Sequence, residues 1–198
     1  MTLKLARAEK GYGGGLSDQD LKSRLLEKTL EKRLVIVPMR DEQLGPGSID
    51  LTLGNEVGVR KKGLVSAIDP KKKETVENSI ETKVLRDTEE YWLMPKEVVL
   101  WLSKEYFSIP PDLKGIIFPR SSWMQLFIDT TGFVDAGFEG KLILEVVNNN
   151  EVSVVLRPGD RICQIVFIED RSPSIQPYRG KYKGRDHLEP SKVWQDYL

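Results

Sequence analysis

Residues 119–148 read PRSSWMQLFIDTTGFVDAGFEGKLILEVVN, and the rest of the chain is interpreted outward from this stretch. Its second half alternates apolar and polar residues, as a half-buried strand does. The run Phe133-Val134-Asp135 precedes an Ala-Gly turn signal, and the residues after the turn are expected to return as a strand that carries Glu145. The sequence therefore predicts a hairpin with one carboxylate on each arm. Because Arg120-Ser121-Ser122 precedes it, this hairpin is typical of a site for a small phosphorylated molecule.

Length and charge narrow the class of protein. The chain has 198 residues, enough for one domain with a hydrophobic core. Its 30 basic residues balance 30 acidic ones, which argues against nucleic acid or an anionic membrane as the main partner. No apolar run is long enough to span a bilayer, and the first residues lack the apolar core of a signal peptide. The single cysteine, Cys163, fits a reducing compartment, so the sequence predicts a cytoplasmic protein.

The same composition argues against two kinds of catalytic site. Zinc deaminases of nucleobases hold their metal with one histidine and two cysteines, or with three cysteines. This chain has one histidine, His187, and one cysteine, and their positions lack metal-ligand spacing. We therefore predict no zinc and no protein-bound metal cluster. A Ser-His-Asp triad is also not expected, because His187 lies in a polar tail and is interpreted as a solvated residue.

The first part of the chain predicts a flexible lead followed by one helix. Residues 1–15 are rich in glycine near their end and are expected to lack regular structure. Ser17 is a candidate N-cap, with an acidic residue three positions later as in a capping box. Leucines at positions 21, 25, 26 and 30 share one helical face, which predicts a helix over residues 18–32.

Short strands dominate the remainder. Apolar residues alternate with Ser48, Asp50 and Thr52, which predicts a strand whose polar face is turned toward a partner. Residues 69–90 are rich in Lys and Glu and are interpreted as an exposed loop or insertion. Further strands are expected near residues 34–38, 57–60, 91–94, 98–102, 114–118, 152–156 and 161–168. The predicted fold is mainly β, a distorted jelly roll or barrel with an N-terminal helix, because the strands do not alternate with helices.

Several polar groups have both a functional and a structural interpretation. Arg120 with the two serines after it could bind phosphate oxygens, or could be a turn with a surface arginine. Asp135 and Glu145 could be catalytic, or could form salt bridges to arginines on neighbouring strands, since a carboxylate in an apolar strand is costly to bury unpaired. Gln164 could donate to phosphate or serve as an ordinary strand amide.

The last segment predicts a lid. Residues 177–185 read PYRGKYKGR and combine cations, tyrosines and two glycines, which suits a segment that closes over a charged ligand. A solvated basic tail is the alternative. We expect a β domain over residues 16–176 and a lid or tail over residues 177–198. Within one small β domain, neither Arg120 nor the tail is expected to reach the hairpin easily.

Five segments together resemble the ordered motifs of the dCTP deaminase and dUTPase superfamily, and are closest to the deaminases. They are PGSIDLTLG, PRSS, GFVDAGFEGKLILE, LRPGDRICQIVF and PYRGKYKG. The resemblance covers residues 16–191. It implies a β-rich homotrimer with active sites shared between subunits, and a nucleoside triphosphate, dCTP or dUTP, bound with Mg²⁺ and without zinc.

The resemblance also implies roles for individual residues. Glu145 would be the general base and then acid of deamination, and Ser121 would help to hold the attacking water. In the diphosphatases the water sits on the aspartate that corresponds to Asp135. Phosphate contacts would come from Arg120, Ser122, Gln164, Tyr178 and Lys181, base contacts from Phe133 and Val134, and further nucleotide contacts from Gln125, Thr131 and Arg185.

Three functions remain open at this point. The first is a dCTP deaminase, including the bifunctional kind that continues to dUMP. Residues 130–137 resemble the threonine-rich approach to the hairpin in these bifunctional members. The second is a dUTP diphosphatase that works through Asp135 alone. The third is a nucleotide-binding regulator with weak catalysis. Glu145 favours the first, whereas Gln125, which stands where deaminases usually carry an arginine, favours the other two.

Overall fold

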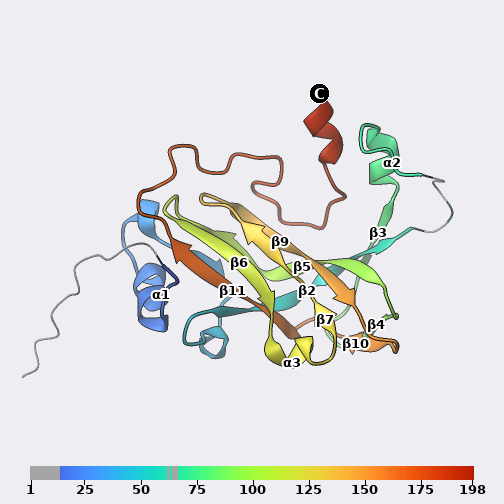
Figure 1. Cartoon of the computed structure of the whole chain (residues 1–198), viewed down its shortest axis with the longest axis horizontal. Coiled ribbons are helices and arrows are strands. Elements are labelled where there is room, and N and C mark those ends of the chain that lie inside the picture. Colours follow the sequence, from blue (N-terminus) through green and yellow to red (C-terminus); the bar gives the residue numbers. More distant parts are fainter. Residues whose placement is uncertain (1–13, 62, 64–66) are drawn as a thin grey trace, which may run out of the picture.

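A computed structural model describes residues 14–61, 63 and 67–198, and it is mainly β (Figure 1). The helical elements are α1 (Asp18–Leu25), α2 (Lys73–Glu77), α3 (Ser121–Met124) and the 3-10 turns η1 (Leu30–Lys32), η2 (Asp41–Gln43) and η3 (Val193–Tyr197). The strands are β1 (Val35–Val37), β2 (Ile49–Arg60), β3 (Ile80–Val84), β4 (Tyr91–Leu93), β5 (Val98–Ser108), β6 (Leu113–Pro119), β7 (Ile128–Asp129), β8 (Gly132–Val134), β9 (Glu139–Asn148), β10 (Val154–Leu156) and β11 (Arg161–Glu169). The predicted β class is confirmed.

One curled sheet carries almost all of these strands. Its order is β7-β9-β5-β2-β11-β6-β8, with β1 added to β5 and β3 added to β2, while β4 and β10 pair separately. The long strand β2 joins the two halves of the sheet, because its first residues pair with β11 and its later residues pair with β5 and β3. Gly54 lies at this change of partner, where a Cβ would come within 2.8 Å of the Leu102 carbonyl oxygen. The glycine therefore permits the close approach at which the sheet curls.

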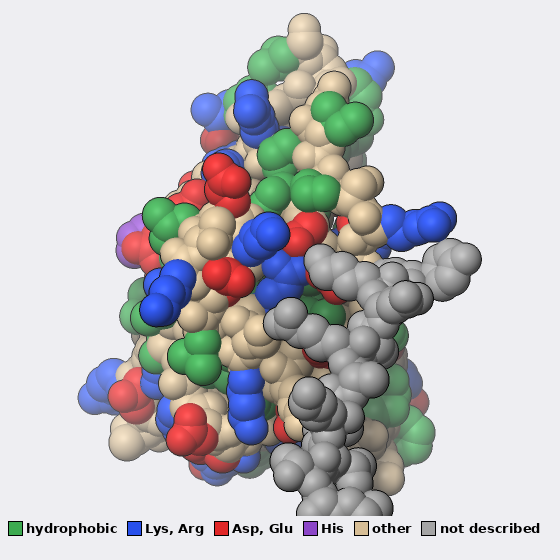
Figure 2. Space-filling model, turned by 90° about the vertical axis from the view of Figure 1, so that its left-hand side faces the viewer, with side chains coloured by type: hydrophobic (Ala, Val, Ile, Leu, Met, Phe, Trp, Pro, Cys, Tyr) green, Lys and Arg blue, Asp and Glu red, His purple; other side chains and the backbone are tan. Residues whose placement is uncertain are grey.

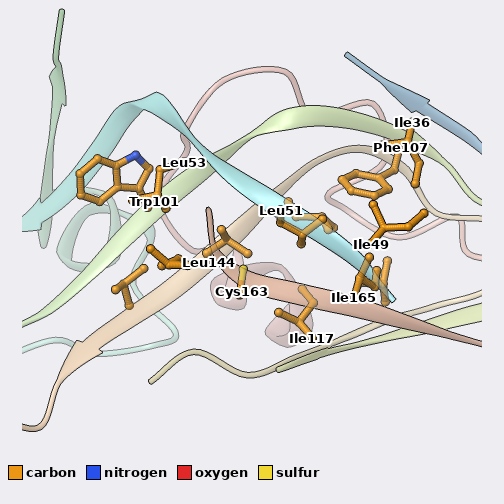
Figure 3. Packing of buried hydrophobic residues seen from close by; sticks show 14 of the residues in the cluster. Ile36, Ile49, Leu51, Leu53, Trp101, Phe107, Ile117, Leu144, Cys163 and Ile165 are labelled. Atoms are coloured by element: carbon orange, nitrogen blue, oxygen red, sulfur yellow. The ribbon is translucent and has the colours of Figure 1, made fainter. Parts of the chain in front are cut away.

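The core lies between the two halves of the curled sheet. Leu51, Ile117, Cys163 and Ile165 come from β2, β6 and β11, and Leu144 of β9 joins them from the other half of the sheet (Figure 3). Alternate residues of β9 are buried, as the predicted period of two requires. Cys163 is fully buried, and burial raises the pKa of its thiol. Its apolar surroundings explain why this cysteine packs as a small core residue.

The predicted N-terminal helix begins as expected but is shorter. The Ser17 hydroxyl accepts from the Asp20 amide at 3.3 Å, and the Asp20 carboxylate accepts from the Ser17 amide, so the capping box is confirmed. The prediction of a helix to residue 32 was wrong, because the Arg24 carbonyl accepts from the Leu34 amide instead of from a further helical turn. As a result Leu26 and Leu30 are each 80% exposed.

The flexible lead lies outside the described residues except for Gly14 and Gly15, which pair with the end of β11. Residues 69–90 were predicted to be an exposed loop or insertion, and the loop was wrong, because these residues contain α2 and β3. The later half of β2 needs a partner on its open edge, and β3 supplies it, while Val76 of α2 is buried. The predicted exposure is confirmed for most of β3.

The predicted hairpin was also wrong in one respect. The turn exists, since the Phe138 amide donates to the Asp135 carbonyl and Gly137 has a φ of 83°. However, β8 pairs with β6, whereas β9 pairs with β5 and β7. The two arms therefore leave the turn into different halves of the curled sheet. A pattern of alternating residues shows that both arms are extended, but it contains no information about which strand each arm pairs with.

A buried polar network lies where the register of the ladder between β2 and β5 shifts. Glu105 is 1% exposed, and its carboxylate accepts from the Thr52 amide at 3.0 Å and from the Gln43 side-chain amide at 2.8 Å. The register of β5 shifts at this point, so the Thr52 amide takes a side-chain acceptor in place of a backbone one. Burial raises the pKa of Glu105, and the hydrogen bonds from Thr52 and Gln43 oppose that shift.

Replacing Glu105 with Ala is expected to lower the free energy of unfolding by about 2–4 kcal/mol, because two buried donors lose their acceptor and a cavity remains. Urea unfolding followed by circular dichroism measures this loss. The matched control is Lys104→Ala, since Lys104 is exposed on the same strand and should change stability by less than about 0.5 kcal/mol. Equal effects of the two substitutions would contradict this account of the network.

Charges of both signs are interspersed over the face that Figure 2 presents, in keeping with a formal net charge of zero. Among the described residues, no helix is both long and apolar enough to cross a membrane.

Candidate active site

A cavity of about 880 Å³ lies between the β8–β9 turn, the outer face of β9 and the C-terminal tail. Seven of the predicted site residues line it, namely Phe133, Val134, Asp135, Glu145, Tyr178, Lys181 and Arg185. Both carboxylates singled out from the sequence therefore face the same space as the cations of the tail. The size of the cavity suits a small ligand rather than a polymer.

Glu145 stands on β9, directly opposite Leu100 of β5. Its side chain lines the cavity, and partial burial there disfavours the charged form and raises the pKa of its carboxyl group. Arg185 of the tail opposes that shift. Among the described residues Glu145 forms no salt bridge, so the structure gives no support to the structural ion pair that was the alternative for this carboxylate. A carboxyl group with a raised pKa is suited to taking up and releasing a proton near neutral pH.

Asp135 is exposed at the end of β8, where the turn begins, and it also forms no salt bridge within the described part of the chain. The turn is held by the tail, because the Tyr178 amide donates to the Ala136 carbonyl at 2.8 Å and the Tyr178 ring lies 5.6 Å from that of Phe138. A Cβ at Gly137 would come within 2.5 Å of Pro177. This glycine therefore allows the tail to pass close behind Asp135.

The tail continues along the start of β9 (Figure 1). The Gly184 amide donates to the Glu139 carbonyl, and the Lys141 amide donates to the Arg185 carbonyl, each at 2.7 Å. The Arg185 guanidinium lies 4.8 Å from the centre of the Tyr182 ring, and burial lowers its pKa while Glu145 and Glu189 oppose that effect. The expectation that the tail cannot reach the hairpin region of its own chain was therefore wrong.

Sequence reasoning missed several residues of the cavity wall. Glu189, Ser191, Gln195 and Asp196 line the cavity from beyond the quoted tail motif. Asp196 pairs with Lys181 at 2.7 Å. The sequence pattern of this segment did not mark it as part of the site. Its end contacts α2, since Lys73 lies 5.1 Å from the centre of the Trp194 ring.

The other predicted site residues lie elsewhere. Arg120, Ser121, Ser122, Gln125, Thr131 and Gln164 do not line this cavity. Most of them cluster around α3, which appears at the opposite side of the sheet from the tail in Figure 1. Ser121, Ser122 and Gln125 are exposed on α3 or at its end, and Thr131 is exposed before β8. Arg120 pairs with Asp50 at 3.2 Å, and Gln164 accepts from the Ser48 hydroxyl at 2.8 Å. Within one chain the predicted site is thus divided into two groups.

The curled β fold, with two carboxylates and several cations around one cavity, defines a protein that handles a small charged ligand. Comparison with known proteins makes this class specific. The dCTP deaminase-like family matches residues 16–169, and the chain belongs to this family.

Individual relatives agree with this assignment. The chain is 36% identical over 179 residues to the "dCTP deaminase, dUMP-forming" of Persephonella marina, covering 89% of this chain and 98% of that protein. It is 40% identical over 191 residues to the protein of the same name from Methanopyrus kandleri, covering 92% and 97%. A crystal structure of the dCTP deaminase from Agrobacterium tumefaciens superimposes with a TM-score of 0.61 at 22% identity, covering 80% of this chain and 47% of that one, which shows the shared fold.

Proposed function

We propose that this protein is a hydrolytic enzyme that deaminates dCTP to dUTP and then converts dUTP to dUMP and pyrophosphate. The observation that carries the proposal is the placement of Glu145, with its raised pKa, in the same cavity as Asp135 and the cationic tail. The relatives from Persephonella marina and Methanopyrus kandleri are both named "dCTP deaminase, dUMP-forming", which agrees with dUMP as the final product. A reducing cytoplasm suits the buried thiol of Cys163.

Deamination requires a group that moves protons at the base. Glu145 takes a proton from the attacking water as oxygen bonds to C4 of cytosine. It then returns a proton to the departing nitrogen as the C4–N bond breaks, which releases ammonia and leaves uracil. Phe133 and Val134 stand at the wall of the cavity beside these groups, where their backbone can contact the base. Ser121, presented by a neighbouring subunit, would help to hold this water.

Hydrolysis of dUTP requires a water placed near the phosphate chain instead. Asp135 orients this water and accepts a proton from it as the water oxygen bonds to the α-phosphorus. The bond from the α-phosphorus to the bridging oxygen breaks, and pyrophosphate leaves. Lys181 and Arg185 line the same cavity and can neutralise charge on the phosphates. In the structure Lys181 is paired with Asp196, so it must exchange that partner for the phosphate chain when the nucleotide enters.

Magnesium would enter with the triphosphate rather than occupy a cage of protein ligands. Among the described residues, no group of three or more His, Cys, Asp or Glu side chains is placed to hold a metal. Mg²⁺ keeps several waters and is commonly bound through substrate phosphates with one or two carboxylates. Asp135 is one exposed carboxylate of the cavity that can supply such a contact. The ion would partly neutralise the phosphate chain.

Shared sites in a homotrimer would bring the two groups of residues together. Arg120 and the serines after it lie apart from the cavity of their own chain, so a neighbouring copy is needed to present them there. Beside them, Met124, Leu126 and Phe127 are 45%, 51% and 60% exposed. Apolar side chains gathered in this way mark protein interfaces, and a second copy is the partner that completes the site.

Light scattering at micromolar concentration is expected to give a mass close to three times 22.6 kDa. Leu126→Asp should shift the protein toward smaller species, because a charge would be buried at the interface. Val84→Asp is the matched control, since Val84 is an exposed apolar residue of β3, which lies in a different part of the molecule from α3 (Figure 1). A stable monomer of the unmodified protein would rule out shared sites.

Removal of residues 178–198 is expected to reduce turnover of dCTP by about tenfold or more, because charge-assisted contacts to phosphate are lost. The β core should still unfold cooperatively in a thermal melt followed by circular dichroism. Lys181→Ala should raise KM for dCTP, whereas Arg179→Ala, an exposed cation that does not line the cavity, should change it by less than about twofold. Unchanged kinetics after truncation would remove the lid from the mechanism.

A dUTP diphosphatase that works through Asp135 alone is the second candidate. Gln125 favours it, because this residue is exposed at the end of α3 and has no charge to support a water at the base. The assay that separates the candidates supplies dCTP or dUTP with Mg²⁺ and identifies the products by chromatography. Ammonia and dUMP from dCTP support the first function, and dUMP from dUTP alone supports the second. If neither nucleotide gives a product, the nucleotide-binding regulator is the remaining candidate.

A further inference from the structure

The polar side of β2 faces two of the predicted phosphate-binding residues. Asp50 is directly opposite Gln164 in the ladder between β2 and β11, and Gln164 is opposite Phe118 of β6. Side chains opposite one another in a ladder share a face of the sheet, and Arg120 lies two residues beyond Phe118. Asp50 of β2, Gln164 of β11, Ser48 just before β2 and Arg120 just after β6 therefore form one cluster.

Asp50 holds the inner side of the Arg120 guanidinium. The Asp50 Oδ2 atom lies 3.2 Å from Arg120 Nε and 3.5 Å from Arg161 Nη1. Arg120 Nη1 also donates to the Arg161 carbonyl at 3.0 Å. Among the described residues, Arg120 Nη2 has no hydrogen-bond partner. The Asp50 side chain is 15% exposed and that of Arg120 is 34% exposed. The carboxylate is therefore more deeply buried, and the unpaired edge of the guanidinium is nearer to solvent.

Ser48 holds Gln164 in a similar way. Its hydroxyl donates to Gln164 Oε1 at 2.8 Å, which leaves the Nε2 group of the amide to donate elsewhere. Within the described part of the chain, no acceptor is bonded to that group. One end of each side chain is therefore fixed, that of Arg120 by Asp50 and that of Gln164 by Ser48, and the other end carries donors that suit an anion.

We propose that Asp50 and Ser48 are positioning residues that orient Arg120 and Gln164 toward the triphosphate. The proposal rests on the proposed function in one respect, that the ligand carries a chain of phosphates. A donor that is already fixed loses less conformational freedom on binding than a free side chain. Two guanidiniums share one carboxylate, so the cluster keeps a net positive charge while its geometry is set.

A different role for Asp50 predicts the opposite result. If this carboxylate only neutralised Arg120 and Arg161, its removal would increase the local positive charge and strengthen the binding of phosphate. If it positions Arg120, its removal frees the guanidinium and weakens that binding. The sign of the change in affinity therefore separates positioning from charge compensation.

The experiment measures binding of inorganic tripolyphosphate by calorimetry to the full chain and its variants. Asp50→Asn should weaken binding by about 10- to 100-fold, the range of one hydrogen bond to a charged group. Asp50→Glu should recover part of the loss, because it restores the carboxylate. Asp41→Asn, an exposed aspartate of η2, should bind like the unmodified protein. Turnover of dCTP at saturation should change by less than about threefold while KM rises, a split that general structural damage would not produce.

Ser48→Ala keeps the proposal testable if Asp50→Asn fails to fold. This variant leaves the ion pair intact and should weaken tripolyphosphate binding by about 3- to 10-fold. Unchanged or tighter binding in the folded variants overturns the proposal, as does an unmodified protein that does not bind tripolyphosphate. If tripolyphosphate binds and Asp50→Asn weakens it, but no nucleotide is turned over, positioning stands and the proposed catalysis fails.

Discussion

Replacing Glu145 with Gln is expected to reduce ammonia release from dCTP by roughly 10²–10⁴-fold, the contribution typical of general acid–base catalysis. Glutamine preserves the size and much of the hydrogen-bonding shape of the side chain, but it cannot carry a proton from water to the leaving amine. Steady-state release of ammonia, measured with a coupled assay at saturating dCTP, gives the change in kcat.

The same substitution should leave hydrolysis of dUTP largely intact, because that reaction changes no bond of the base. Glu139→Gln is the matched control, since Glu139 lies on the same side of β9 and contacts Tyr106 and the tail without lining the cavity. Ammonia release at the unmodified rate in Glu145→Gln would show that another group moves the proton.

The pH dependence of the unmodified enzyme should report the same carboxyl group. Burial raises the pKa of Glu145, and only the deprotonated form can accept a proton from water. The rate of deamination should therefore rise with pH as Glu145 ionises, and this rise should lie above the range of an ordinary glutamate. Arg185 opposes the shift, so Arg185→Ala should move the rise to still higher pH.

Much of the fold could be predicted because strands leave a local signal. The alternation of buried and exposed residues in β9, and the capping box at Ser17, both depend on neighbours a few residues away. The errors share a different cause. The helix ends at Leu25 because Leu34 returns to bond with Arg24, and the arms of the β8–β9 turn separate because β6 and β5 are available as partners. Contacts distant in sequence decided both outcomes.

The residues of the candidate site were likewise predicted only where a local sequence motif marks them. Motif resemblance identified Asp135 and Glu145, and the cavity brings them together with Tyr178, Lys181 and Arg185. It also identified Arg120 and Gln164, but the roles of these residues stay predictions because they lie outside that cavity. Asp196 could not be found from the sequence, since a single carboxylate near a terminus has no pattern. Its pairing with Lys181 depends on how the tail folds back.

Replacing Asp135 with Asn is expected to give the reverse of the Glu145 result. Hydrolysis of dUTP should fall by about 10²-fold or more, because an amide orients the attacking water less strongly than a carboxylate and cannot accept its proton. Deamination of dCTP should continue at a reduced rate, since Glu145 stands on another strand and keeps its proton-transfer role. The product of dCTP should then change from dUMP to dUTP, which ion-exchange chromatography resolves.

This reciprocity is a stronger test than either loss alone. A substitution that only damages the cavity would reduce both reactions together, because Asp135 and Glu145 line the same space. Two carboxylates with separate tasks must instead give two variants that each retain the reaction the other has lost. If Asp135→Asn still forms dUMP from dUTP at the unmodified rate, the water that attacks the phosphate is held by another group. Glu189 and Asp196 would then be the carboxylates to replace next, since both line the cavity from the tail.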